Sequence, residues 1–308
     1  MDLSTKYLGL TLRSPLVASA GPLTGSLAGI TRLAEAGVGA VVLPSLFEEQ
    51  LRAEPDREHD WSHRYLDLIE RAVAEVDIPV IASLNGVTTG GWTDHASAMQ
   101  AAGASAIELN IYYLPGDPLI PARDAERRYT EILTTVKAVV SIPVAVKLSP
   151  YFSSLGEMAL VLDHAGADGL VLFNRFLQTD INPETFTVST GFRLSVSPEA
   201  ALPRAWTSRL YGLVRCSLAA STGVETASDV AAYVLAGADV VMTTSSLLRH
   251  GPAHAQVLLD GLSAWLDRKG FTSVAAARGV LAQVDGGPAF SRAGYLSAIA
   301  QATHAYAR

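Results

Sequence analysis

Four short stretches of this sequence follow one pattern, and that pattern limits the possible fold more than any other feature. They are EAGVGAVVL ending at Leu43, AAGASAIEL ending at Leu109, HAGADGLVL ending at Leu172 and LAGADVVMT ending at Thr243. In each, an Ala-Gly pair typical of a helix end precedes an apolar run of strand length, as expected where a helix leads into a buried parallel strand. The stretches recur about every 65 residues, roughly twice the length of a strand-helix unit, so each interval is expected to hold one further strand.

Further apolar runs supply the remaining strands. They are LVASAG (16–21), DIPVIASLNG (77–86), SIPVAVKLSP (141–150) and LVRCSLAAST (213–222). Eight strands alternating with helices in 308 residues predict an α/β fold, a (β/α)8 TIM barrel, as a single domain over residues 1–308. In such a barrel the chemistry is expected at the carboxyl ends of the strands.

Three segments lie outside the repeating units. TKYLGLTLRSP, with a turn at Gly9, predicts an N-terminal hairpin that plugs the amino-terminal mouth of the barrel. Between strands six and seven, Arg175 to Pro203 predicts a small β insertion, with alternation in TFTVST and FRLSVS. After Lys269, FTSVAAARGVLAQ and SRAGYLSAIAQATHAYAR predict appended helices.

Composition excludes several classes of function. A net charge of −7 without a lysine-rich stretch argues against partners such as nucleic acid or anionic membranes. No apolar run approaches the roughly 20 residues of a membrane helix, and no leader pattern is present, so we expect a cytoplasmic protein. A single cysteine, Cys216 in a predicted strand, leaves no disulfide framework and no iron-sulfur cluster held by this chain alone. The expected partner is a small molecule.

The predicted strand ends carry amides, hydroxyls and one lysine, Lys147. This pattern predicts a ring of uncharged hydrogen-bonding groups around a single cation. No cluster of His, Asp and Glu occurs there, so no metal is expected, and a G-x-G-x-x-G fingerprint for a nicotinamide cofactor is absent. The strand ends are Ser19-Ala20-Gly21, Pro44-Ser45, Ser83 to Gly86, Glu108 to Asn110, Lys147 to Ser149, Asn174-Arg175, Ser221 to Gly223 and Thr244 to Ser246.

The last two strand ends favour a phosphate-bearing ligand. In barrels of this type the loops after strands seven and eight commonly bind phosphate through backbone N–H groups. Here STGVETASDV supplies Thr222 and Gly223, and TTSSLLRHGP supplies Thr244 and Ser245. The same hydroxyls fit helix caps equally well.

Lys147 ends the run IPVAVK, where a lysine is costly unless it meets an anion. Three interpretations remain open at this point. Lys147 is a salt-bridged structural lysine, an electrostatic partner of a cofactor, or a nucleophile that forms a Schiff base.

Six motifs occur in this order along the chain: ASAG, ELN, VAVKLSPYF, GLVLFN, STGVETASD and LLRHGP. Over nearly its whole length the chain resembles the dihydroorotate dehydrogenase family, FMN-dependent barrels of pyrimidine biosynthesis. The resemblance implies that Lys147 lies beside the flavin N1 and C2 carbonyl and stabilises the reduced ring. It also implies which residues contact FMN or the substrate: Ser19, Ala20, Gly21, Ser45, Asn85, Asn110 and Asn174 around the ring, and Thr222, Gly223, Thr244 and Ser245 at the phosphate.

The chain departs from this family where the substrate would bind. Pro44, followed by Ser45, replaces a family lysine, Tyr113 replaces the cysteine base, and Pro115 replaces a substrate-binding asparagine. The asparagine-rich loop after strand two is replaced by EEQLRAEPDREHDWSHRY. A site that has lost half of its polar contacts loses discrimination for its ligand. We therefore expect an oxidoreductase acting on CH–CH groups of a substrate other than dihydroorotate.

For the reaction itself, the catalytic candidates are Lys147, Asn110 and Tyr113. Tyr113 either moves the proton that accompanies hydride transfer or fills the emptied position of the base. The partners expected are a second copy in a homodimer and a separate electron-transfer protein. Two other functions stay open: a Schiff-base lyase of a phosphorylated sugar that uses Lys147, and a non-catalytic FMN-binding subunit.

Overall fold

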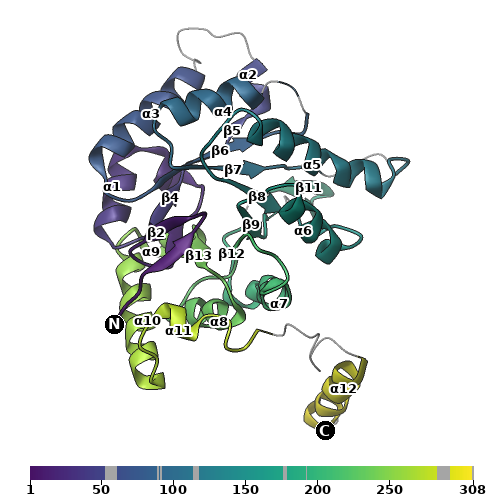
Figure 1. The fold of residues 1–308 in the computed structure, drawn as a ribbon. Helices are drawn as coiled ribbons and strands as arrows, with labels where there is room; N and C mark the ends of the chain where they lie inside the picture. Colours follow the sequence, from purple (N-terminus) through teal and green to yellow (C-terminus); the bar gives the residue numbers. More distant parts are fainter. Residues whose placement is uncertain are drawn as a thin grey trace.

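Eight parallel strands close into a barrel, which confirms the predicted (β/α)8 fold (Figure 1). The computed structural model describes residues 1–52, 61–88, 90, 92–113, 118–175, 179–191, 193–282 and 292–306. Neighbours pair in the order β4-β3-β13-β12-β9-β8-β7-β6, and a pairing between β4 and β6 closes the ring. The barrel strands are β3 (Leu16–Ala18), β4 (Ala40–Val42), β6 (Val80–Asn85), β7 (Ala106–Asn110), β8 (Val144–Leu148), β9 (Gly169–Leu172), β12 (Ser217–Ser221) and β13 (Val240–Thr243).

Helices surround this ring and bury its outer face (Figure 1). In the four repeated stretches the glycine takes a positive φ, between 90° and 110°, at Gly37, Gly103, Gly166 and Gly237. Because L-residues with a side chain rarely adopt this conformation, glycine is the residue that can end the helix and turn the chain into the next strand. The main covering helices are α1 (Leu27–Glu35), α3 (Trp61–Glu75), α4 (Trp92–Ala101), α5 (Ala122–Lys137), α6 (Leu155–His164), α7 (Ala201–Leu210), α8 (Ala227–Ala236) and α10 (His254–Lys269).

The N-terminal hairpin forms as predicted, from β1 (Thr5–Tyr7) and β2 (Leu10–Leu12) with its turn at Leu8 and Gly9. Its apolar side chains join a second buried cluster with inward-facing strand residues such as Val17, Ala145 and Met242. The Leu8 N–H donates to Ser217 Oγ at 3.0 Å. The hairpin therefore fills the amino-terminal end of the barrel and leaves the carboxyl end for ligands.

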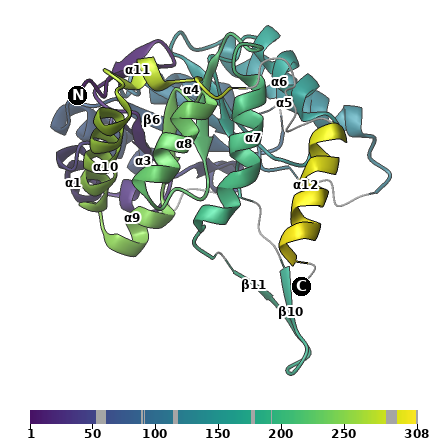
Figure 2. The same cartoon turned by 90° about the horizontal axis from the view of Figure 1, so that it is seen from below.

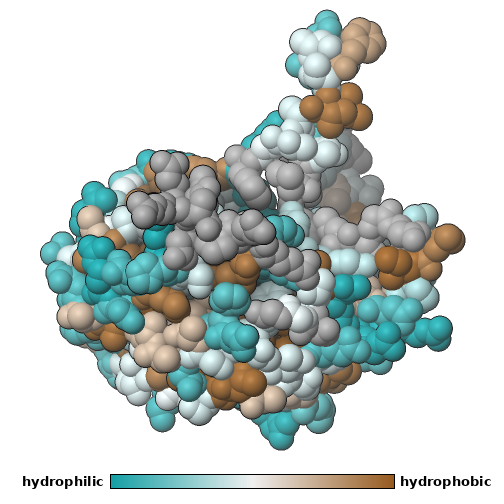
Figure 3. Space-filling model, turned by 90° about the horizontal axis from the view of Figure 1, so that it is seen from above, coloured by the Kyte–Doolittle hydropathy of each residue, from teal (hydrophilic) through white to brown (hydrophobic). Residues whose placement is uncertain are grey.

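The segment between β9 and β12 carries a second hairpin, β10 (Thr179–Asn182) with β11 (Thr187–Thr190), which we call the hairpin arm. It projects from the barrel (Figures 2 and 3), and its apolar residues Ile181, Phe186 and Val188 are exposed. The prediction was right for TFTVST and wrong for FRLSVS, whose described residues 193–197 form no strand. Ser195 is instead buried against the loops after β12 and β13. The predicted boundary at Pro203 is also wrong, because α7 already includes that residue.

Of the two appended helices, the second is confirmed as α12 (Arg292–Tyr306). The first is much shorter than predicted, since only Val274–Ala277 (α11) is helical. Shorter elements are β5 (Leu46–Phe47), α2 (Glu48–Arg52), α9 (Ser245–His250) and the 3-10 turns Pro22–Gly25 and Ser197–Ala200. In the described ranges, the structure contains no helix with the length and apolar character needed to traverse a bilayer.

Candidate active site at the carboxyl ends of the strands

Lys147 lies near the carboxyl-terminal end of β8, at the mouth of the barrel. Ala145, two residues before it on β8, belongs to the interior cluster, so the alternation of the strand turns Lys147 inward too. Its residue is 7% exposed, and its Nζ lies 3.2 Å from Glu108 Oε1 and 3.4 Å from Ser19 Oγ. The predicted lysine therefore lies at the barrel mouth, where it contacts Glu108 and Ser19.

The carboxylate of Glu108 corrects the prediction of an uncharged ring. Glu108 is 1% exposed and faces inward from β7, and it forms a buried ion pair with Lys147. Its second oxygen, Oε2, is buried without a hydrogen-bond partner in the described part of the chain. The signal was present in the sequence, because Glu108 lies two residues before the inward-facing Asn110 in ELN.

Amides and hydroxyls from four strand ends form a continuous series beside this ion pair, here called the amide–hydroxyl chain. Ser45 Oγ lies 2.8 Å from Ser83 Oγ, and Asn110 Nδ2 donates to Ser45 Oγ at 3.4 Å. Asn174 Nδ2 donates to Asn110 Oδ1 at 2.6 Å. The predicted residues Ser45, Asn110 and Asn174 are thus brought together. Such a series can orient a polar ligand through fixed donors and acceptors.

The register of the neighbouring strands shows where Asn85 lies. Asn110 is paired with Lys147 on one side and with Asn85 on the other, so Asn85 lies at the same level of the barrel mouth. Ser83 is held by Tyr65, whose hydroxyl donates to the Ser83 carbonyl at 3.2 Å and accepts from its N–H at 2.8 Å. Burial raises the pKa of Tyr65, so this phenol stays neutral.

The segment Ser19-Ala20-Gly21 is fastened to the end of β13. The Thr244 hydroxyl donates to the Ser19 carbonyl at 3.0 Å, and the Ser19 N–H donates to the Thr243 carbonyl at 3.0 Å. A Cβ at Gly21 would lie 2.5 Å from Thr244 Cγ2, so a larger residue there would have to displace the Thr244 side chain. The hydrogen bond to the Ser19 carbonyl uses the hydroxyl proton of Thr244, which is one of the predicted phosphate ligands.

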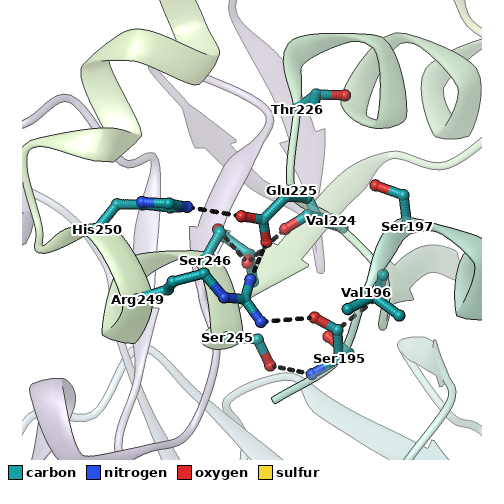
Figure 4. Close-up of polar contacts among 12 residues, drawn as sticks. Ser195, Val196, Ser197, Val224, Glu225, Thr226, Ser245, Ser246, Arg249 and His250 are labelled. Atoms are coloured by element: carbon teal, nitrogen blue, oxygen red, sulfur yellow. Dashed lines mark hydrogen bonds and ion pairs between the residues drawn. The ribbon is translucent and has the colours of Figure 1, made fainter.

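The predicted phosphate loops meet at a residue that the sequence reasoning missed, Ser195 (Figure 4). The Gly223 N–H donates to Ser195 Oγ at 3.2 Å, and the Ser195 N–H donates to Ser245 Oγ at 2.9 Å. Thr222, beside Gly223, has a positive φ of 81°, a strained conformation for a β-branched residue and one that often accompanies binding sites. The predicted groups are therefore adjacent, with Ser195 between the two loops.

A cluster of charged residues ties the same loops together (Figure 4). Glu225, after β12, pairs with Arg249 and with His250, both from α9. Arg249 also donates to the Ser195 carbonyl at 3.2 Å. The cluster fixes the spacing of the loops on which a bound phosphate would depend.

A cavity of about 650 Å³ opens between the strand ends and the hairpin arm. Two ion pairs form among the residues that line it, with Arg175 3.0 Å from Glu199 and Arg193 2.8 Å from Asp180. Asn174 and Thr222 contribute to its wall, whereas Lys147 and Tyr113 do not. The lining is Pro150, Tyr151, Phe173, Asn174, Arg175, Thr179, Asp180, Ser189, Thr190, Gly191, Arg193, Glu199, Leu202, Pro203 and Thr222.

Tyr113 is partly buried at the end of β7, where it packs against the core. The guanidinium of Arg128, from α5, lies 4.2 Å from the centre of its ring, a cation–π contact that fixes the ring. Pro115, the other substituted position nearby, falls outside the described residues.

Neither metal nor thiol chemistry is supported by the groups at this mouth. In the described ranges no three His, Cys, Asp or Glu side chains gather as a metal site. Cys216 precedes β12 and so lies at the opposite, amino-terminal end of the barrel. Burial, together with the charge of Asp163, raises the pKa of Cys216 to about 12, so its thiol is not a base at neutral pH.

Comparisons of the sequence with known proteins identify one family. Residues 55–266 match the family model described as dihydroorotate dehydrogenase. The chain is 29% identical to the dihydroorotate dehydrogenase B (NAD(+)) catalytic subunit of Methanocella arvoryzae, over 87% of this chain and 94% of that protein. It is 25% identical to the same subunit of Methanothermobacter thermautotrophicus, over 88% and 96%. It is 27% identical to the dihydroorotate dehydrogenase A (fumarate) of Lactobacillus delbrueckii subsp. bulgaricus, over 65% and 66%.

Proposed function

This chain belongs to the dihydroorotate dehydrogenase family of flavin-dependent oxidoreductases, and we propose that it binds FMN noncovalently and uses it to oxidise or reduce a small organic substrate other than dihydroorotate. The observation that carries the proposal is Lys147, a buried cation at the barrel mouth beside the amide–hydroxyl chain. A lysine in that position can stabilise the negative charge that a flavin gains on reduction.

The donor set at the mouth fits a flavin. Bound FMN would supply the hydride-accepting ring, which no side chain of this chain can replace. Lys147 would hold the N1 region, Asn110 and Asn174 would orient ring or substrate, and Ser19 to Gly21 would line one side. Among the described residues, Glu108 Oε2 is buried without a hydrogen-bond partner, which leaves one acceptor beside Lys147 unused. Gly223 and Ser245 would hold the phosphate end, close to Ser195.

The substrate end of the site supports a different substrate. Ser45, next to the proline that replaces a family lysine, is part of the amide–hydroxyl chain, and a hydroxyl there cannot pair with a carboxylate as a lysine does. Tyr113 stands where the family has its cysteine base. In the proposed reaction Tyr113 transfers the proton, with Arg128 fixing its ring.

The ion pair also bears on the alternative of a Schiff-base lyase. A lysine nucleophile needs an amine that can reach a carbonyl, whereas Lys147 Nζ is held in a buried ion pair with Glu108 at 3.2 Å. This contact favours the electrostatic role of Lys147.

The test of the proposed function is spectroscopic. We expect the purified protein to show flavin absorption bands, or the flavin-free protein to bind added FMN, and the bound flavin to be reducible. Absence of flavin bands together with failure to bind added FMN would refute the proposal. A flavin that binds but is reduced by no organic substrate in a panel would instead support a non-catalytic FMN-binding subunit.

We also propose that electrons leave the flavin through a separate protein. Two relatives are named as the catalytic subunits of NAD(+)-linked enzymes, and the present chain has no G-x-G-x-x-G fingerprint. The isolated protein is expected to reduce an artificial dye but not NAD(+). Direct reduction of NAD(+) by the isolated chain would contradict this expectation.

A further inference from the structure

Glu108 is the most deeply buried ionisable group at the barrel mouth. It is 1% exposed, and an ionised carboxylate at such a place is expensive unless it is paired and hydrogen-bonded. One oxygen meets Lys147 Nζ at 3.2 Å, while the other has no partner in the described ranges. The carboxylate is thus only half compensated by the protein around it.

Lys147 depends on the same contact. An ammonium group has three N–H donors, and the structure uses one for Glu108 and one, at 3.4 Å, for Ser19 Oγ. Glu108 is therefore the one anion that holds Lys147 among the described residues. Removing it would leave a lysine with a single long hydrogen bond.

The charge of Glu108 affects the pKa of two other buried groups. After burial, it is the next cause that raises the pKa of Tyr7, a residue of the N-terminal hairpin. Burial also raises the pKa of Tyr65 on α3, with a further contribution from Glu108. A carboxylate that acts on two tyrosines in this low-dielectric interior also acts on any charge that forms next to Lys147.

We propose that Glu108 is a positioning residue that holds Lys147 at the mouth and offsets part of its charge, so that the pair, rather than the lysine alone, sets the reduction potential of the bound flavin. The proposal rests on the proposed function, because it requires a flavin beside Lys147. The two roles of Glu108, positioning Lys147 and offsetting its charge, change the reduction potential in opposite directions. Loss of the lysine's position lowers the potential, whereas loss of the offsetting negative charge raises it.

The experiment measures the midpoint potential of the FMN-loaded protein and of Glu108→Gln. Glutamine keeps the shape and an oxygen that can accept from Lys147, but it removes the charge. One buried charge next to the ring is expected to change the equilibrium constant for reduction by at least about tenfold, since the effective dielectric constant there is about 20. Tenfold corresponds to about 30 mV for a two-electron couple, and we expect the shift to be upward. Sulfite, which adds to electron-poor flavins, should bind the flavin of Glu108→Gln at least about tenfold more tightly than the flavin of the wild-type protein.

Two further variants complete the test. Glu108→Asp keeps the charge but shortens the side chain by one methylene group, so it should loosen the contact with Lys147 and lower the potential. Asp163→Asn removes a different buried carboxylate, one that pairs with Arg215 outside the barrel mouth, and should leave the potential unchanged. Should Glu108→Gln fail to fold, Glu108→Asp carries the test, because it keeps the charge and changes only the contact with Lys147.

A potential of Glu108→Gln that is unchanged or lower than wild type would overturn the proposal. So would a potential of Glu108→Asp equal to that of the wild-type protein. Failure of the proposed function is distinguishable from these results, because in that case the wild-type protein itself would bind no flavin and give no potential to compare.

Discussion

Asp229 fastens the loop after β12, and its replacement by asparagine should show how much the stability of the folded protein depends on this one carboxylate. Its Oδ2 accepts from Ser197 Oγ at 2.7 Å, from the Thr226 N–H and hydroxyl at 2.9 Å each, and from the Glu225 N–H at 3.3 Å. Asp229 also lies in the first turn of α8, where a negative charge is favourable.

The expected loss follows from these contacts. An amide oxygen can accept the same hydrogen bonds, but bonds to a neutral acceptor are roughly half as strong as charge-assisted ones. Three contacts of 2.9 Å or less, each weakened by about 0.5 to 1 kcal/mol, give a destabilisation of about 2 kcal/mol for Asp229→Asn. Urea unfolding of the flavin-free protein at pH 7 measures this difference in free energy of unfolding.

The difference in stability between wild type and Asp229→Asn should depend on pH. Burial alone would raise the pKa of Asp229, but hydrogen bonds from Ser197, Thr226 and Glu225 lower it below its ordinary value of 3.8. A carboxyl with a lowered folded pKa contributes stability that is present above the unfolded pKa and lost as the pH falls through the folded one. The difference between wild type and Asp229→Asn should therefore be constant above about pH 5 and shrink below about pH 4.

The control is Asp260→Asn, which removes an exposed carboxylate on α10 and should change stability by less than about 0.5 kcal/mol. A loss for Asp229→Asn no larger than that of the control would refute the reasoning. So would a loss that persists undiminished to pH 3.

Three other outcomes are expected. Gly223→Ala should weaken FMN binding, because Gly223 has a φ of +69° and an added Cβ would lie 2.6 Å from the Ala200 nitrogen; an unchanged dissociation constant in a fluorescence titration would remove the loop from the phosphate site. Lys147→Met should lower the flavin's reduction potential by the equivalent of about 1.5 to 3 kcal/mol, as redox titration would show, whereas a borohydride-trapped adduct with a keto substrate on wild-type Lys147 would favour the lyase. Dihydroorotate should reduce the bound flavin negligibly in anaerobic spectra, and rapid bleaching would show that the substituted positions do not matter.

Sequence periodicity was enough to locate every barrel strand. The runs that contain β6 and β8 are mostly apolar and are buried on both faces, as a strand between a packed interior and covering helices must be. The glycine in each repeated stretch was equally informative, because a positive φ is a backbone requirement that few other residues meet. Local signals of this kind do not depend on which distant segment lies beside them.

The misses concern contacts between distant segments. FRLSVS alternates like a strand, yet Ser195 is buried because Gly223 and Ser245 bind it, 28 and 50 residues away in the chain. Nothing in the local pattern distinguishes that anchoring from strand pairing. Glu108 was read as part of an uncharged ring because its partner Lys147 is 39 residues away, although its inward orientation followed from the alternation of β7.

The N-terminal hairpin has a consequence for how this chain is made. Thr5 donates to the carbonyl of Asp239, 234 residues later, and Asp2 bridges to Ser273. A ribosome adds about 5 to 20 residues per second, so the hairpin is made many seconds before β13, whose residues it contacts. Until β13 has been made, the apolar residues of the hairpin have no closed interior to enter. The hairpin therefore precedes every barrel strand in synthesis but can take its final position only after the last of them.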